Sequence, residues 1–206
     1  MAEGRRVINN IQRAATLFLV KNIFSLGLSL VSVITGLGYP LIPIHMTMIS
    51  ALTIGIPSFF LALEPNYERV KGKFLPTVLR KALPGGITNI LAVLMAQAFG
   101  VIFGLPEAES ATVCVSVLSV VGLLVLFETC KPFDKFRAVL WGFLAAGIAL
   151  CFTLLRRLFE LQVADSRTLL VMAALMLMTP TVFFAMQRLF DWGDKLVALL
   201  RQRRCK

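Results

Sequence analysis

Six long apolar stretches constrain this chain more than any other feature of its sequence. They run over residues 14–37, 39–63, 85–103, 111–127, 138–155 and 169–189. A bilayer core about 30 Å thick needs roughly 20 apolar residues for each helical crossing. Six such crossings leave no room in 206 residues for a soluble catalytic domain as well. The predicted fold class is therefore an all-α membrane protein with six transmembrane helices.

Composition agrees with a membrane protein and argues against other classes. Hydrophobic residues make up 58% of the chain, and the mean hydropathy is +0.83, which a soluble domain of this size does not need. The net charge of +10 is explained by basic cytoplasmic loops, so we expect no nucleic-acid partner. The four cysteines form no CxxC pair, which argues against a disulfide framework or a zinc site.

The basic residues predict how the chain is oriented. With the N-terminus inside, all but four of the 21 Lys and Arg fall in cytoplasmic segments, the exceptions being Lys21, Arg156, Arg157 and Arg167. By the positive-inside rule, both termini are then cytoplasmic. The resulting division is a stalk start (1–13), two helices with ion-pathway residues (14–63), a basic cytoplasmic connector (64–84), four supporting helices (85–189) and a basic cytoplasmic tail (190–206).

Polar residues distinguish the first two apolar stretches from the other four. In the first, Asn22, Ser25, Ser29 and Ser32 recur at helical spacing beside Lys21. In the second, Thr47, Ser50 and Thr53 are three apart, and Gly55 and Pro57 follow. Proline frees backbone carbonyls in the preceding turn, which are tolerated at membrane depth where they line a protected or wet cavity. This pattern predicts an ion pathway formed by Lys21, Asn22, Ser25, Ser50 and Thr53, with Gly55 and Pro57 as a supporting kink.

Packing is the alternative interpretation for several of these residues. Serines and threonines at helical spacing also serve as small hydrogen-bonding contacts between membrane helices. Lys21 is harder to explain in this way, because a charge inside a span is costly and is by default a functional hypothesis. We interpret Asn89 and Gln97 as packing contacts and His45, near the outer end of the second stretch, as an interfacial residue.

Two motifs in the first 85 residues resemble a known family. The stretch GRRVINNIQRAATLFLVKNIFSL, followed by YPLIPIHMTMISALTIGIPSFFLALEPN, is similar to the fifth and sixth membrane helices of cation-transporting P-type ATPases, and the segment ALEPNYERVKGKFLPTVLRKALPGG looks like a bacterial subgroup. The remaining residues match the family's last four helices in helix number and loop charge. The resemblance implies the C-terminal part of the pump's membrane domain.

The family's catalytic motifs are not found in these residues. The sequence contains no DKTGT, TGES or GDGxNDxP motif, and these carry the phosphorylation chemistry, the Mg²⁺ and the ATP. The resemblance therefore implies that the chain alone is inactive, that it binds no cofactor itself, and that it is a fragment, a split-gene product or a truncated frame. Its partners would be the lipid bilayer, a monovalent or divalent cation, and the missing N-terminal half of a pump in the cell membrane.

Carrying the family's ion ligands onto this sequence gives an incomplete set. Asn22 and Thr53 stand at the matching Asn and Thr and are the candidate metal ligands. Ser25, Ser50 and Ile54 replace a Glu, an Asn and an Asp, and the eighth-helix carboxylate falls near Gly122. Calcium prefers six to eight oxygens, including carboxylates, so these residues cannot form a full calcium site. Lys21 stands where the gastric proton–potassium pump also has a lysine, and we predict that it occupies the space of a second cation.

Two other functions remain open at this point. A stand-alone six-helix transporter or channel predicts an inverted repeat between the two halves, and the polar, kinked first pair has no counterpart in the second half. A non-transporting membrane assembly subunit is the other alternative. The sequence leaves the ion, its stoichiometry and its direction open.

Overall fold

Helices are the only regular elements in the part of the chain that the structure describes. The computed structural model describes residues 2–36, 38–64, 73–162 and 165–204. They form α1 (Ala2–Thr35), α2 (Pro43–Ser50), the π-helix η1 (Ala51–Gly55), α3 (Ile56–Leu63), α4 (Phe74–Ile102), α5 (Glu107–Thr129), α6 (Lys135–Thr153) and α7 (Ser166–Arg204). With α2, η1 and α3 as one span, six helices in these ranges are long and apolar enough to cross a bilayer. The chain is thus a multi-pass integral membrane protein.

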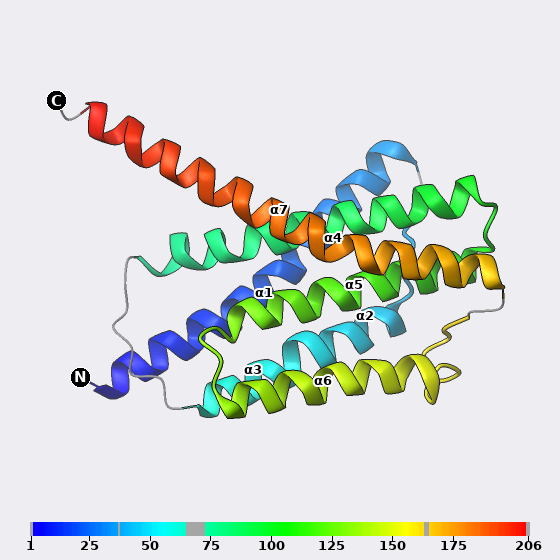
Figure 1. The fold of residues 1–206 in the computed structure, drawn as a ribbon, viewed down its shortest axis with the longest axis horizontal. Helices are drawn as coiled ribbons and strands as arrows, with labels where there is room; N and C mark the ends of the chain where they lie inside the picture. Colours follow the sequence, from blue (N-terminus) through cyan, green and yellow to red (C-terminus); the bar gives the residue numbers. More distant parts are fainter. Residues whose placement is uncertain (1, 37, 65–72, 163–164, 205–206) are drawn as a thin grey trace.

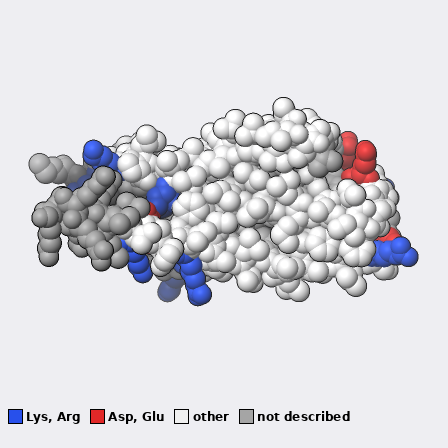
Figure 2. Space-filling view, turned by 90° about the horizontal axis from the view of Figure 1, so that it is seen from above, with Lys and Arg blue, Asp and Glu red and all other residues white. Residues whose placement is uncertain are grey.

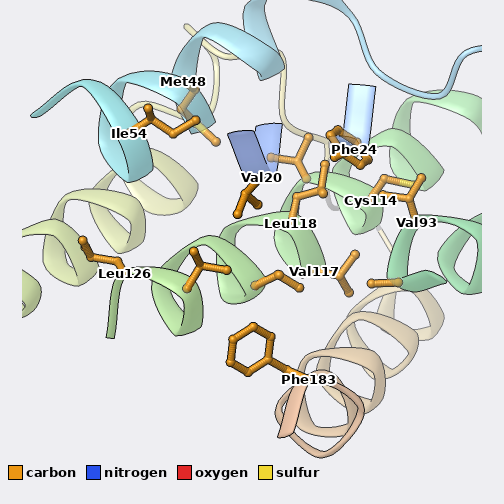
Figure 3. Packing of buried hydrophobic residues seen from close by; sticks show 14 of the residues in the cluster. Val20, Phe24, Met48, Ile54, Val93, Cys114, Val117, Leu118, Leu126 and Phe183 are labelled. Carbon is orange, nitrogen blue, oxygen red and sulfur yellow. The ribbon is translucent and has the colours of Figure 1, made fainter. Parts of the chain in front are cut away.

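α5 lies at the centre of the bundle (Figure 1) and contacts α1, α2, α4, α6 and α7. Its buried side chains include Val117 and Leu118, which Figure 3 shows between Phe183 of α7 on one side and Met48 and Ile54 on the other. A helix in this position is apolar on all sides because it meets other helices in every direction. α5 is accordingly more buried than any of the other five spans.

Charged side chains gather at the two ends of the molecule. Figure 2 shows Lys, Arg, Asp and Glu near both ends of the face in view, with a broad uncharged belt between them. α1 begins and α7 ends at the same end of the bundle (Figure 1). This arrangement agrees with an even number of crossings. Which end is cytoplasmic remains a prediction from the basic residues.

α1 and α4 pack closely because glycines stand at their contact. A Cβ at Gly27 would lie 2.3 Å from Ile90 Cδ1, and a Cβ at Gly86 would lie 2.6 Å from Ile23 Cγ2. In lipid there is no hydrophobic driving force between helices, because the lipid tails are as apolar as the side chains. Membrane helices therefore gain much of their association energy from close packing of this kind. α4 is thereby held against the first helix rather than only against α5.

Several helices extend beyond the predicted apolar stretches. α4 begins at Phe74 instead of residue 85, so much of the predicted connector is helical, and residues 65–72 of it lie outside the described part. α7 continues without a break through the predicted tail to Arg204, while residues 205–206 lie outside. α1 begins at Ala2 and includes the predicted stalk start. Hydropathy locates where a helix is apolar, and polar residues of good helix propensity continue a helix past that point.

A buried charge cluster joins α1, α3 and α6 at the end where the chain begins; we call it the Glu64 cluster. Arg13 Nη1 lies 2.9 Å from Glu64 Oε2, and Arg137 Nε lies 2.7 Å from Glu64 Oε1. The exposed fractions of the three side chains are 10%, 11% and 8% for Arg13, Glu64 and Arg137. Asn10 Nδ2 also donates to the carbonyls of Ala62 and Glu64, at 2.9 and 3.0 Å. These bonds satisfy carbonyls that the end of α3 leaves without helical donors.

Glu64→Gln is expected to destabilise the chain strongly. The substitution keeps the shape but leaves two buried guanidinium groups without a counter-charge, which costs about 3 kcal/mol. The measurement is the unfolding of the purified chain in detergent micelles by a denaturing surfactant. Glu128→Gln is the matched control, because Glu128 pairs with Lys131 at 2.6 Å but their side chains are 25% and 49% exposed. Its loss should cost less than about 1 kcal/mol, and equal effects would refute the role of the cluster.

The rate of alkylation of Cys130 measures whether Glu64→Gln loosens the structure next to the cluster. Burial raises the pKa of the Cys130 thiol to about 11, so in the native chain it stays protonated and unreactive at pH 8. Arg137 Nη1 donates to the Cys130 carbonyl at 3.2 Å, which ties this residue to the cluster. We expect faster iodoacetamide labelling of Cys130 in Glu64→Gln than in Glu128→Gln.

Candidate ion pathway in the membrane

The second span is interrupted in its middle by the π-helix η1. The N–H of Ile56 bonds to the carbonyl of Ala51, five residues back, and Pro57 follows without an N–H to donate. π-helices occur mostly as single turns inside α-helices, and frequently at functional sites. Gly55 closes η1, and Pro57 lies in the first turn of α3. The break therefore lies at the predicted kink.

Neighbouring helices enclose this break. Thr53, Ile54 and Pro57 are buried, and η1 contacts α1, α5 and α6. Thr53 Oγ1 donates to the carbonyl of Ile49 at 2.7 Å, which leaves the lone pairs of the hydroxyl free to accept. In a bilayer, irregular backbone persists only where protein or a wet cavity surrounds it. The enclosure explains how the break can exist at membrane depth.

A small cavity lies beside the break, between α1, α2–η1, α4 and α5; we call it the inner cavity. Its volume is about 30 Å³, and its polar lining comes from Lys21, Ser50, Thr53 and Asn89. One water molecule needs roughly 10–15 Å³ of such space. The inner cavity can thus hold a water molecule or a dehydrated cation, in contact with neutral oxygen atoms and next to a lysine.

Three of the five predicted pathway residues line the inner cavity, and two do not. Lys21, Ser50 and Thr53 face it. Asn22 is exposed, and Ser25, one turn after Lys21, is half-buried and does not line the cavity. The cavity side of α1 is formed by Lys21 and apolar neighbours. The structure therefore does not bring Asn22 together with Thr53, and their role as metal ligands stays a prediction.

Asn89 was interpreted as a packing contact, yet it faces the inner cavity. Its side chain is 7% exposed, and its Oδ1 has no hydrogen-bond partner among the described residues. A buried amide oxygen without a donor is costly, so water or a cation in the cavity is the natural partner. A polar residue in the apolar stretch 85–103 was the available signal, but the sequence does not say toward which helix it points.

Among the described residues, no carboxylate lines the inner cavity. The same residues contain no group of three His, Cys, Asp or Glu side chains that could hold a metal ion. Calcium sites in proteins draw much of their affinity from carboxylates. Whether these residues contribute to a cation site stays a prediction.

Curated relatives match most of this chain. It is 34% identical over 199 residues to a Streptococcus pneumoniae protein named probable cation-transporting ATPase exp7, a match that covers 90% of this chain and 25% of the relative. It is 34% identical over 154 residues to the calcium-transporting ATPase CtpE of Mycolicibacterium smegmatis, covering 68% of this chain and 20% of that protein. The homologues of this chain are cation-transporting ATPases. The chain spans about a quarter of the length of the first of them.

A third relative gives the same result. The calcium-transporting ATPase CtpE of Mycobacterium bovis is 36% identical over 163 residues, covering 72% of this chain and 20% of that protein. No family model and no solved structure matches the chain. The resemblance to cation-transporting ATPases found in the motifs is confirmed, and the matches also cover residues beyond those motifs.

Gly122→Ala is expected to disturb the break through Thr53. A Cβ at Gly122 would lie 2.6 Å from Thr53 Cγ2 and 3.0 Å from its Cβ, so the side chain or the π-helix must shift. Overpacking of this kind costs about 1–3 kcal/mol, measured by unfolding in detergent micelles. Gly142→Ala in α6 is the control, because nothing lies within 4 Å of its added Cβ.

The double variant Gly122→Ala, Thr53→Ser separates this contact from a general helix effect. Serine lacks the Cγ2 methyl that stands nearest to the new Cβ. We therefore expect the double variant to be more stable than the sum of the two single changes predicts. Strict additivity would show that Gly122 and Thr53 do not interact.

Proposed function

We propose that this chain is the C-terminal membrane portion of an ATP-driven cation pump. In this proposal α1 and the α2–η1–α3 span contribute part of the ion route, and α4 to α7 support them. The observation that carries it is the inner cavity, where Lys21, Ser50 and Thr53 meet beside a helix broken at Pro57. The homologues supply the reaction class, because each is a cation-transporting ATPase.

The ATP-hydrolysing chemistry belongs in this proposal to parts of the pump outside this chain. The relatives are about four to five times longer than the segment matched here, and ATP and Mg²⁺ would bind there. The cytoplasmic end of the bundle would be the end where α1 begins, since the basic residues gather in the segments on that side. The pump would lie in the cell membrane.

The exposed polar side of α1 provides a surface for the remaining part of the pump. Asn22 and Ser29 are exposed there, although amide and hydroxyl groups gain little from lipid. A helix from the missing part would cover them. The carboxylates that the inner cavity lacks would also come from that part of the pump. The transported cation would then be held with Thr53 and Ser50, with Lys21 reducing the positive charge that the site accepts.

A chimera tests this proposal. This chain replaces the matching segment of the Streptococcus pneumoniae relative, and cation-stimulated ATP hydrolysis is measured in membranes. Thr53→Ala removes one oxygen ligand worth about 1 kcal/mol, so the cation concentration for half-maximal activity should rise about fivefold. Lys21→Ala removes a positive charge from the cavity and should lower that concentration.

Thr153→Ala in α6 is the matched control for Thr53→Ala. Its hydroxyl donates to the carbonyl of Ala149 at 2.9 Å, as Thr53 does to Ile49, but it is exposed on the outside of the bundle. This variant should leave the cation dependence unchanged. Identical cation dependence in Thr53→Ala, Lys21→Ala and Thr153→Ala would remove the inner cavity from the ion route.

A further inference from the structure

A second, much larger cavity opens at the end of the bundle opposite to the start of α1; we call it the outer vestibule. Its volume is about 1190 Å³, and it lies between the start of α2, the end of α4, the start of α5 and the link from α6 to α7. These segments meet at one end of the bundle (Figure 1). Since a water molecule occupies about 30 Å³ in the liquid, this space is large enough for many of them.

His45 lines this vestibule and is almost fully buried. It is 1% exposed, which corrects its interpretation as an interfacial residue. Neither Nδ1 nor Nε2 has a hydrogen-bond partner among the described residues. An imidazole always carries at least one N–H donor, and a buried polar group left unpaired costs about 1–3 kcal/mol. A buried ring with two unpaired nitrogens at the wall of a cavity points to a partner inside that cavity.

The charged groups around the vestibule come from two segments. The link between α6 and α7 contributes Arg156, Arg157 and Glu160, and the first turn of α5 contributes Glu107. None of the four has an ion pair within the described ranges. Glu160 has a φ of +53°. The Glu160 charge and the backbone carbonyls of Phe159 and Glu160 act electrostatically on the His45 ring without completing a hydrogen bond to it.

Two other polar groups at this end already have partners. Glu109 is buried and accepts a hydrogen bond from the Thr168 hydroxyl. Gln97 of α4 donates to the carbonyl of Gly38 at 3.4 Å. The vestibule also contains Tyr39, so the titratable and charged groups around His45 are this phenol, the two arginines and the two exposed glutamates.

We propose that His45 is a proton-binding site that exchanges protons with the outer side through the vestibule. Imidazole is the side chain that gains a proton between about pH 5 and 8. Burial opposes the charged imidazolium most strongly, and the oxygen atoms of Glu160 and Phe159 partly offset this effect. A metal ion fits less well, because the described residues offer no group of three ligating side chains and two arginines face the same space.

This inference rests on the proposed function, since it places the proton on the ion route. α2 carries His45 in the vestibule and Ser50 in the inner cavity. Five residues of helix rise about 7.5 Å, so the imidazolium would stand near the cation's path. Protonation from outside then opposes a cation in the inner cavity and favours its release.

The chain contains one histidine, so its protonation can be followed without assignment. The chain with imidazole labelled in ¹³C and ¹⁵N is placed in lipid nanodiscs, and its NMR signals are recorded from pH 4 to 9. We expect a single titration step. A ring that stays neutral across this range while the helical content is unchanged would overturn the proposal.

Two matched variants test whether the Glu160 carboxylate stabilises the proton on His45. Glu160→Gln removes the carboxylate beside the ring, so the midpoint of the titration should move to lower pH. Glu107→Gln removes a carboxylate from the first turn of α5 in the same vestibule. Glu107 is not among the groups that act on the His45 ring, so this variant should move the midpoint less. Equal shifts of the titration midpoint in both variants would overturn this role of Glu160.

The side of the membrane from which His45 takes up its proton tests this inference independently of the proposed function. In proteoliposomes whose orientation is established by trypsin cleavage of the basic C-terminal end, His45 should follow the pH on the side opposite to that end. Titration from the tail side would overturn the inference. The result does not depend on ATP hydrolysis, so a chimera without cation-dependent activity would refute the proposed function alone.

Discussion

The rest of the structure depends on enclosing one break in a membrane helix. Between Ala51 and Pro57 the second span loses regular α-helical bonding, and the bilayer core offers no water to satisfy the backbone groups that this leaves. α1, α5 and α6 surround the break. Because Gly122 of α5 has no side chain, Thr53 packs directly against the backbone of α5 at this residue. The central, apolar position of α5 is a consequence of this requirement. The break, in turn, adds Thr53 to the polar groups that Lys21 and Asn89 bring to the inner cavity.

α3, the segment after the break, is fixed at both of its ends. Its start is held by the contact of η1 with α5, and its end is held by Asn10, Arg13 and Arg137 around Glu64. Two of these three residues belong to α1, a helix of 34 residues that continues beyond its apolar part. A displacement of the start of α1 would therefore reach α3 through buried charged contacts. Such contacts tolerate little separation, because an unpaired buried charge is far more costly than an exposed one.

The number and order of the spans, and the position of the kink, could be predicted from the sequence. Each depends on a local property: the length and hydropathy of one stretch, or the presence of a proline in it. The sequence also singled out Lys21, Ser50 and Thr53, which line the inner cavity. It failed where the answer depends on which neighbour covers a given face. Asn22 shares the helical spacing of the stripe but is exposed, whereas Asn89 and His45 are buried against cavities because other helices pack over them. The Glu64 cluster joins residues 13, 64 and 137, and no periodicity within one helix can indicate such a contact.

The charges that line the two cavities bear on how a cation would be held under the proposed function. The inner cavity has neutral oxygens and a lysine, and the outer vestibule has a histidine between balanced charges. Neither offers the excess negative charge that a divalent cation needs in a medium of low dielectric constant. Under the proposed function, the attractive charge would come from parts of the pump outside this chain. The neutral oxygens and the lysine of this chain would then weaken cation binding, which would serve the release of the cation.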